Sequence, residues 1–364
     1  MVTTPLRTVI GVISGTSMDG IDIALIRTDG LQIVQTGPGM MAPYPRDLRR
    51  RLLAFLDDPS RAEHDPLTEL EEAVTDAFTA AIDGFIRQEG LDRAGIDLVG
   101  NHGQTVYHRP ERRFTRQLSL GQRMASALGI TVVDDFRKAD VVAGGQGAPL
   151  VPLYHAALSA SLPQPLMVLN LGGVANVTYL DGETVIAFDT GPASALIDDL
   201  MLSRFGVPYD DGGRIAREGK VDGAVLAALM ANPFFDARPP KSLDRNDFHL
   251  RAKATDRLED HDAAATLTAF TIAATVDALR HVPRKPLRWL VTGGGRHNAG
   301  IMQGLAEKLA VPVEPVETVG WNGDLLEAQC FAFLAVRAQM GLPLSLPTTT
   351  GVPRPMSGGR ISTP

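Results

Sequence analysis

The chain has 364 residues, more than one compact core usually organises, so its length predicts two domains. Hydrophobic residues make up 44% and charged residues 21%, which is ordinary for a soluble globular protein with enough apolar material for two cores. The formal net charge of −7 argues against a broad binding surface for nucleic acid or an anionic membrane, and neither is expected as a partner.

Cysteine usage and the N-terminal sequence predict a cytoplasmic protein. Cys330 is the single cysteine, so neither an internal disulfide nor a thiolate metal cage can form within the chain. The first residues are typical of a strand followed by a loop, not of a signal peptide, and no apolar stretch approaches the length that spans a bilayer.

The first predicted elements are short strands. β-branched residues predict a strand over 8–13, which ends in a loop over 14–20 and is followed by a second strand over 21–26. Asp29-Gly30 predicts a tight hairpin before a third strand over 31–34.

A helix is predicted next. Asp65 followed by Pro66 is typical of a helix start, and apolar residues then recur at helical spacing until Gly90.

The strand pattern returns in the middle of the chain. Strands are predicted over 166–171, 174–180 and 184–188, with Gly172-Gly173 in the first connection and Asp181-Gly182 in the second. The order of strand, glycine loop, strand, Asp-Gly turn and strand matches that of the N-terminal segment. This repetition predicts an internal duplication of a hairpin that faces phosphate.

Helices and one strand complete the pattern. The predicted ranges are a helix over 193–201, a helix over 262–279, a strand over 289–291 that enters Gly293-Gly294-Gly295 and a helix up to Leu309, and a buried helix over 325–340. An irregular tail is predicted after Pro343.

These elements predict an α/β protein of two related lobes, with mixed sheets flanked by helices and ligands bound in a cleft between the lobes. Lobe I is expected to comprise residues 1–135 with about 340–364, and lobe II residues 136–339.

The loop after the first strand is a candidate phosphate site. Glycines permit close backbone approach, hydroxyl groups donate hydrogen bonds, and Asp19 can hold a metal ion or its water. The loop lacks the Gly-Lys-Ser/Thr signature of a Walker P-loop. Taken alone, a Gly/Ser/Asp loop between strands is more often a plain turn than a phosphate site.

Asp189-Thr190-Gly191-Pro192 forms a second candidate loop, between a strand and a helix. Asp189 can accept a proton from an attacking hydroxyl or water, and the helix N-terminus behind it favours a nearby anion. An aspartate before a helix is also a common N-cap, so the residues alone leave both roles open.

Three consecutive glycines, Gly293 to Gly295, permit close approach to a purine or ribose. Together, the three loops supply what phosphoryl transfer requires, namely cradles for phosphates, a metal ion and a positioned base. Two polar segments, 101–108 and 144–149, are rich in Gln, His and Gly and suit recognition of sugar hydroxyl and amide groups, although both can be tight loops.

Taken together, these motifs resemble the anhydro-N-acetylmuramic acid kinase family, which has a two-lobed, duplicated actin-like (ribonuclease H-like) ATPase fold. The resemblance covers essentially the whole chain, with motifs from near residue 9 to beyond residue 330 in the family's order. It rests on residues 14–22, 102–105, 144–152, 170–173, 188–192, 293–295 and 324–332.

The resemblance implies a reaction. Members of this family take 1,6-anhydro-N-acetylmuramic acid from cell-wall turnover together with ATP and Mg²⁺. They hydrolyse the anhydro bond and phosphorylate O6, giving N-acetylmuramic acid 6-phosphate and ADP. The family is usually homodimeric.

The resemblance also implies site residues. Asp189 corresponds to the base that activates water against the anomeric carbon, and Glu327 to a carboxylate that assists proton movement, with helix capping as the alternative. Asp19 is expected to hold Mg²⁺ through a water. The implied ATP-binding residues are Gly15, Thr16, Ser17, Met18, Asp19, Gly20, Ile21, Asp22, Gly172, Gly173, Gly293, Gly294 and Gly295. The implied sugar-binding residues are His102, Gln104, Thr105, Gln146, Ala148 and Pro149.

The chain departs from the family pattern at Ala193-Ser194, where Gly-Asn is usual, and at Leu243-Asp244 and Asn246. These departures leave open a kinase for another anhydrosugar such as levoglucosan. A hexokinase of the ROK type and a non-catalytic nucleotide-binding switch on the same fold are further alternatives.

Overall fold

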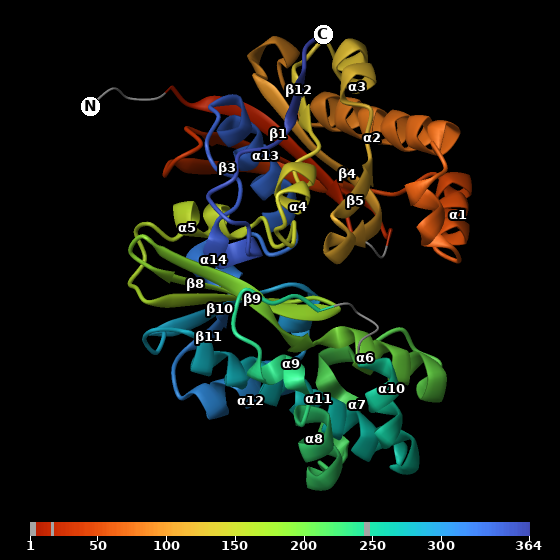
Figure 1. Cartoon of the computed structure of the whole chain (residues 1–364), viewed down its shortest axis with the longest axis vertical. Coiled ribbons are helices and arrows are strands. Elements are labelled where there is room, and N and C mark those ends of the chain that lie inside the picture. The colour runs from red at the N-terminus through yellow and green to blue at the C-terminus, as the bar shows by residue number, and fades with distance from the viewer. Residues whose placement is uncertain (1–4, 16–17, 244–247) are drawn as a thin grey trace. The chain divides into compact units, whose positions relative to one another are not determined.

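The structure is a computed structural model, in which residues 5–15, 18–243 and 248–364 are described (Figure 1). By its internal contacts the chain divides into two compact units, residues 1–161 with 325–364, and residues 162–324. The predicted lobe limits, 135 and about 340, both fall inside the first unit. The helix over 326–339 belongs to that unit because it packs on the unit's sheet.

The first unit is built on a mixed sheet of seven strands. The strands are β1 (Arg7–Ser14), β2 (Ile21–Thr28), β3 (Val34–Ala42), β4 (Leu98–Arg109), β5 (Phe114–Leu118), β6 (Val132–Asp134) and β12 (Arg360–Ser362). Their order is β12-β6-β4-β1-β2-β3, and β5 pairs with β4. β1 runs antiparallel to β2 and parallel to β4, and β2 and β3 are antiparallel.

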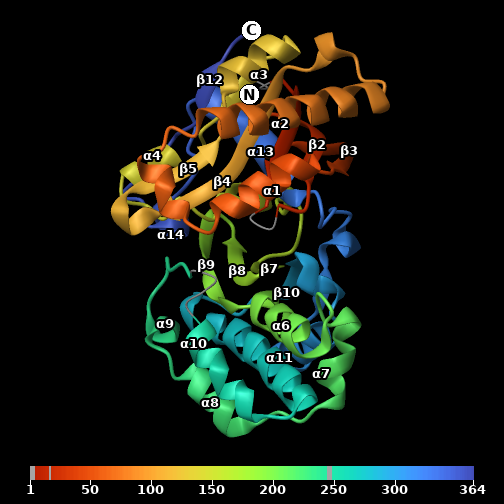
Figure 2. The same cartoon turned by 90° about the vertical axis from the view of Figure 1, so that its right-hand side faces the viewer.

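α2 (Thr68–Gln88) and α13 (Leu326–Gln339) pack on opposite faces of this sheet. The other helices of the unit are α1 (Arg46–Phe55), α3 (Gly121–Leu128), α4 (Lys138–Val142), α5 (Pro152–Leu158) and α14 (Pro347–Thr350). Alternate strand residues such as Ile10 and Val12 join α2 in one core, whereas Gly11 and Gly100 lie under α13 (Figure 2). A Cβ on Gly11 would lie 1.8 Å from the carbonyl oxygen of Ala328. Glycine is therefore required where α13 meets the sheet.

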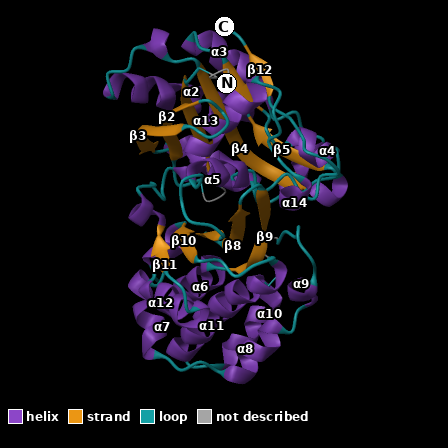
Figure 3. Ribbon diagram, turned by 90° about the vertical axis from the view of Figure 1, so that its left-hand side faces the viewer, coloured by secondary structure: helices purple, strands orange, loops and turns teal. Residues whose placement is uncertain are grey.

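The second unit has a five-stranded sheet with all its long helices on one face (Figure 3). Its strands are β7 (Leu166–Leu171), β8 (Val174–Asp181), β9 (Thr184–Pro192), β10 (Arg288–Thr292) and β11 (Val313–Pro315). Its helices are α6 (Ser194–Leu200), α7 (Arg214–Glu218), α8 (Gly223–Met230), α9 (Pro233–Asp236), α10 (His249–Ala252), α11 (Asp260–Asp277) and α12 (Ala299–Leu309). A core around Trp289, Phe188 and Phe270 fills the space between sheet and helices.

Both units share one strand topology. In the second, β7 pairs antiparallel with β8 and parallel with β10, β8 pairs antiparallel with β9, and β10 pairs parallel with β11. The first unit repeats this arrangement: its order β6-β4-β1-β2-β3 corresponds to β11-β10-β7-β8-β9, with the same strand directions. The predicted duplication is therefore real. It confirms the expected fold class, a duplicated α/β fold with mixed sheets flanked by helices.

Several predicted boundaries are wrong. The third strand is Val34–Ala42, not 31–34, because Asp29 Oδ1 accepts hydrogen bonds from the backbone N–H groups of residues 31, 32 and 33 and holds a wider turn.

α2 begins at Thr68 after Leu67 in the left-handed region, so Asp65 precedes the helix without capping it. The tail after Pro343 contains α14 and β12, and β12 pairs with β6.

One helix in the described part of the chain, residues 260–281, is long and apolar enough to cross a membrane, although the sequence predicted no such stretch. Most of this segment is buried in the core of the second unit, as helices in protein cores commonly are.

Replacing Gly11 with Ala is expected to lower the free energy of unfolding by about 2–3 kcal/mol, because the added methyl group collides with the backbone of α13. Gly84→Ala is the matched control: a Cβ there meets nothing within 4 Å inside α2, so alanine should stabilise the protein by about 0.5–1 kcal/mol. Urea unfolding of the two variants measures both. Equal stability of Gly11→Ala and the wild type would contradict the close packing.

Candidate active site

The loop between β1 and β2 carries the first predicted phosphate residues. Thr16 and Ser17 lie outside the described residues. Met18 has a φ of 55° and a fully buried side chain, and its carbonyl accepts a hydrogen bond from Arg49 Nε at 2.9 Å. Asp19 is exposed, with its carboxylate 3.6 Å from Arg49. The fold thus anchors the loop through Met18 and leaves the neighbouring carboxylate at the surface.

Gln104, a predicted sugar residue, supports this loop from β4. Its buried amide donates to the carbonyl oxygens of Gly15 at 3.3 Å and Thr105 at 3.1 Å, and its oxygen accepts from the Tyr44 hydroxyl at 2.6 Å. Residues 101–108 form no tight loop, the alternative that the sequence left open, because they lie inside the twelve-residue strand β4. Contact of Gln104 and Thr105 with a sugar stays a prediction.

His102 is buried and neutral. Burial and the charge of Arg137 hold the pKa of His102 well below its usual range. Its Nδ1 donates to the carbonyl of Gly103 at 2.9 Å, and its Nε2 accepts from Arg137 Nε at 2.8 Å. Arg137 also donates to the carbonyl of Gly147 at 2.7 Å. Sequence analysis missed Arg137, since its partners lie 35 residues before and 10 residues after it in the chain.

The loop over 144–149 holds the other predicted sugar residues. Asp140 fixes it, accepting from the backbone N–H of Gly147 at 2.6 Å and from the hydroxyl groups of Ser345 and Thr350. The carbonyl of Gln146 accepts from His108 Nε2 at 2.9 Å. The loop containing Gln146, Ala148 and Pro149 is therefore held by hydrogen bonds to β4, to Asp140 of α4 and to the C-terminal segment.

Glu327 lies in the first turn of α13, with part of its side chain open to solvent. Desolvation by the surrounding protein raises the pKa of its carboxyl group, while the positive charge of Arg137 lowers it. Glu327 and Arg137 thus influence one another electrostatically.

Asp189 lies near the end of β9 in the second unit. Its backbone N–H donates to the carbonyl of Lys241 at 2.9 Å, and its carboxylate Oδ2 accepts from the backbone N–H of Leu243 at 2.8 Å. Burial raises the pKa of Asp189 to about 7, against the opposing effects of that N–H and the Lys241 charge. α6 begins at Ser194 with Ala193 as its N-cap, so Asp189 does not cap this helix.

Gly172 and Gly173 connect β7 to β8. Their carbonyl oxygens accept hydrogen bonds from the backbone N–H groups of Ala193, Ser194 and Ala195 at 2.9–3.2 Å. The first N–H groups of α6 are therefore partly engaged. A Cβ on either glycine would come no closer than 3.6 Å to protein atoms, so packing within the protein does not require glycine here.

The three glycines after β10 differ in how closely protein atoms surround them. A Cβ on Gly293, which has a φ of 78°, would lie 2.4 Å from Asn170 Oδ1, and one on Gly295 would lie 2.6 Å from Leu171 Cβ. A Cβ on Gly294 meets nothing within 4 Å. Two glycines thus let the loop pack on β7, and Gly294 alone borders open space. A short 3₁₀ turn, Gly294–His297, contains the last two glycines and leads to α12, whose N-cap is Asn298.

No group of three His, Cys, Asp or Glu side chains that could hold a metal ion is found among residues 5–15, 18–243 and 248–364. Mg²⁺ in phosphoryl-transfer sites usually binds through one or two carboxylates and the substrate phosphates. The exposed carboxylate of Asp19 fits that chemistry.

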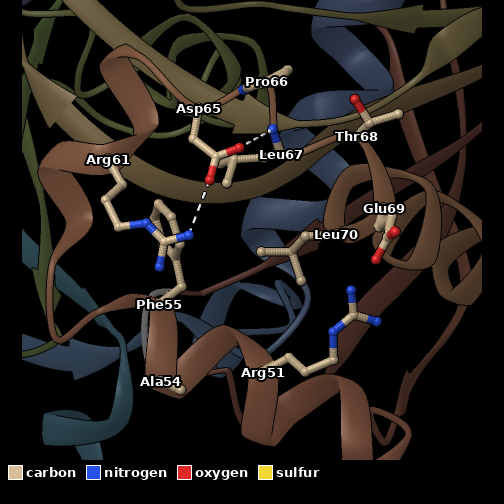
Figure 4. A pocket seen from close by; sticks show the side chains of 10 residues that line it. All are labelled: Arg51, Ala54, Phe55, Arg61, Asp65, Pro66, Leu67, Thr68, Glu69 and Leu70. Atoms are coloured by element: carbon tan, nitrogen blue, oxygen red, sulfur yellow. Dashed lines mark hydrogen bonds and ion pairs between the residues drawn. The ribbon is translucent and has the colours of Figure 1, made fainter.

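A cavity of about 520 Å³ lies in the first unit between α1 and the start of α2 (Figure 4). Arg61 and Asp65, which line it, form an ion pair at 3.0 Å. None of the predicted site residues lines this cavity.

Residues 7–364 match the family model described as anhydro-N-acetylmuramic acid kinase. A protein of that name from Rhodospirillum rubrum is 51% identical over 352 residues, covering 96% of this chain and 92% of that protein. Another from Acidiphilium cryptum is 51% identical over 360 residues, covering 98% of each.

Among solved structures, a ROK family glucokinase from Streptomyces griseus in complex with glucose and AMPPNP is similar with a TM-score of 0.40 and 13% identity. It covers 90% of this chain and 98% of that one. The family match and the identities of about half over nearly the full length show that the chain belongs to the anhydro-N-acetylmuramic acid kinase family.

Proposed function

We propose that the protein is an ATP-dependent anhydro-N-acetylmuramic acid kinase that acts in peptidoglycan recycling in the cytoplasm, as a homodimer. It converts 1,6-anhydro-N-acetylmuramic acid, water and ATP into N-acetylmuramic acid 6-phosphate and ADP. The observation that carries the proposal is the match of residues 7–364 to this one kinase family. A kinase of levoglucosan or another anhydrosugar is not favoured, since the similar proteins bear the name of the muramic acid enzyme.

In the proposed reaction Asp189 accepts a proton from water, whose oxygen bonds to the anomeric carbon while the bond from that carbon to O6 breaks. O6 then takes the γ-phosphoryl group of ATP. A carboxylate with a pKa of about 7 suits this role, because a general base works best when its pKa lies near the operating pH. The backbone N–H of Leu243 holds one carboxylate oxygen and so orients the base.

ATP is proposed to bind along the described residues Gly15 and Met18 to Asp22, at Gly172-Gly173 and at Gly293 to Gly295. Support comes from the three glycines that the packing of the protein leaves free, Gly172, Gly173 and Gly294, where a backbone can approach a nucleotide closely. Asp19 would hold Mg²⁺ through a water, and the ion would supply positive charge to the phosphates.

The sugar is proposed to contact His102, Gln104, Thr105 and the loop containing Gln146, Ala148 and Pro149. Arg137 connects His102 to the carbonyl of Gly147 in this loop, and His108 holds the carbonyl of Gln146. The amide of Gln104 is held separately by the carbonyl oxygens of Gly15 and Thr105. Glu327 is proposed to move a proton during ring opening, in keeping with the raised pKa of its carboxyl group.

The reaction in ¹⁸O-water tests the proposed function. The protein is incubated with 1,6-anhydro-N-acetylmuramic acid, ATP and Mg²⁺, and the product is analysed by mass spectrometry. We expect one ¹⁸O at C1 of a sugar that also carries phosphate. Faster phosphorylation of levoglucosan would favour the other anhydrosugar, and ADP release that no sugar stimulates would indicate a nucleotide switch.

Asp189→Asn is expected to lower kcat/KM by about 10²–10⁴-fold, because the amide cannot accept the proton. Coupled ADP release measures the loss. Asp181→Asn on the neighbouring strand β8 removes an exposed ion pair with Arg284 and serves as the control, with activity near that of the wild type. Retained turnover in Asp189→Asn would contradict the assignment of the base.

The pH profile of kcat/KM is expected to fall on the acidic side with an apparent pKa near 7, since Asp189 must be ionised to act and burial raises its pKa to about 7. Lys241→Met should move this limb to higher pH, because the Lys241 charge lowers the pKa of Asp189. Asp181→Asn should leave the limb in place. A limb near about pH 4, the ordinary range of an aspartate, would contradict the prediction.

A further inference from the structure

Arg296 directly follows the triple glycine, and its side chain is 3% exposed. The guanidinium pairs with Glu317 Oε1 at 3.0 Å and Asp324 Oδ1 at 2.8 Å, and donates to the carbonyl oxygen of Gly293 at 3.1 Å. The backbone N–H of Arg296 donates to the same carbonyl at 3.2 Å. One residue therefore holds the first glycine of the loop by two hydrogen bonds.

A buried guanidinium needs such partners, because leaving water costs several kcal/mol that only well-placed charges and hydrogen bonds offset. Both carboxylates lie nearer the surface, with 47% of the Glu317 and 76% of the Asp324 side chain exposed. The buried Arg296 guanidinium is thus held by two carboxylates that lie closer to the surface. The desolvation energy of the buried guanidinium is therefore offset mainly by its contacts with Glu317, Asp324 and the carbonyl of Gly293.

The same contacts tie the glycine loop to residues 316–324, the segment that leads into α13. The Thr292 hydroxyl donates to the carbonyl of Gly323 at 3.1 Å, and the backbone N–H of Gly323 donates to Glu317 Oε1 at 3.2 Å. A Cβ on Gly323 would lie 2.7 Å from Arg296 Nε. The loop is therefore clamped between β7, which meets Gly293 and Gly295, and the Arg296 guanidinium.

From this geometry we infer that Arg296 is a positioning residue for the nucleotide: it fixes the loop so that Gly294, the glycine bordering open space, presents its backbone to ADP or ATP. The inference rests on the proposed function, which assigns the triple glycine to the nucleotide. Arg296 itself acts through the loop, so its removal should weaken nucleotide binding without a matching effect on the sugar.

Arg296→Met tests this, with isothermal titration by ADP and separate KM values for ATP and for the anhydrosugar. We expect ADP binding to weaken about tenfold, the loss typical of one charge-assisted hydrogen bond, and the KM for ATP to rise by a similar factor. The KM for the sugar should stay unchanged. Arg296→Lys should recover part of the ADP affinity, since an ammonium group can still reach one carboxylate.

Arg288→Met is the matched control. Arg288 lies on β10, which leads into the same loop, and pairs with Glu314 at 2.5 Å, but it does not touch the glycines. Its loss should leave ADP affinity unchanged. If Arg296→Met does not fold, Glu317→Gln combined with Asp324→Asn removes both anions from exposed positions and should weaken ADP binding in the same way.

The outcomes separate the inference from the function on which it rests. Wild-type protein that binds no ADP and phosphorylates no anhydrosugar would overturn the proposed function, and the inference with it. Wild-type binding that persists unchanged in Arg296→Met, or in the double carboxylate variant, would overturn the inference alone. An equal rise in both KM values would also overturn it, because it would mark a general structural defect.

Discussion

The first unit depends on the close approach of α13 to its sheet. Gly11 of β1 and Gly100 of β4 are neighbours in the sheet, and a Cβ on Gly100 would lie 2.1 Å from the carbonyl of Phe331. Only glycine, which has no Cβ, lets the helix approach the sheet this closely. The ring centroids of Phe331 and His102 lie 4.5 Å apart, and the Arg137 guanidinium lies over the Phe331 ring. The helix that packs on the sheet therefore also contacts the predicted sugar-binding residue His102 and its partner Arg137.

The two units use one topology for different tasks. In the first, the β1–β2 connection is anchored by the buried side chain of Met18 and by Gln104. In the second, the corresponding connection, Gly172-Gly173, is anchored by backbone N–H groups at the start of α6. The duplicated strands fix where each loop begins and ends, and the surrounding helices decide how each is held. A common frame can thus support loops of different chemistry.

Burial is the main electrostatic influence on the candidate site. It keeps His102 and His108 neutral, with the pKa of His108 lowered to about 4, and it brings the pKa of Asp189 up to about 7. Both histidines are held by hydrogen bonds to carbonyl or hydroxyl groups. The buried guanidinium of Arg296 is paired with two carboxylates at short distance, whereas Arg137 donates to His102 Nε2 and to the carbonyl of Gly147. The site therefore combines neutral hydrogen-bonding groups with a few well-paired ions.

The sequence by itself determined the duplication, most strands of the duplicated hairpins and the family, because hydrophobic alternation and glycine motifs are local signals. It misplaced the third strand and did not predict β5, β6 or β11. The sequence also singled out Asp189 with two roles open, and the position of Ala193 as the N-cap of α6 removes the capping role. Only the tertiary structure revealed Arg137, Asp140 and the wider turn at Asp29, together with the strand β12 that pairs with β6. These depend on partners that the folded chain brings together, often from distant positions, and no local pattern encodes such pairings.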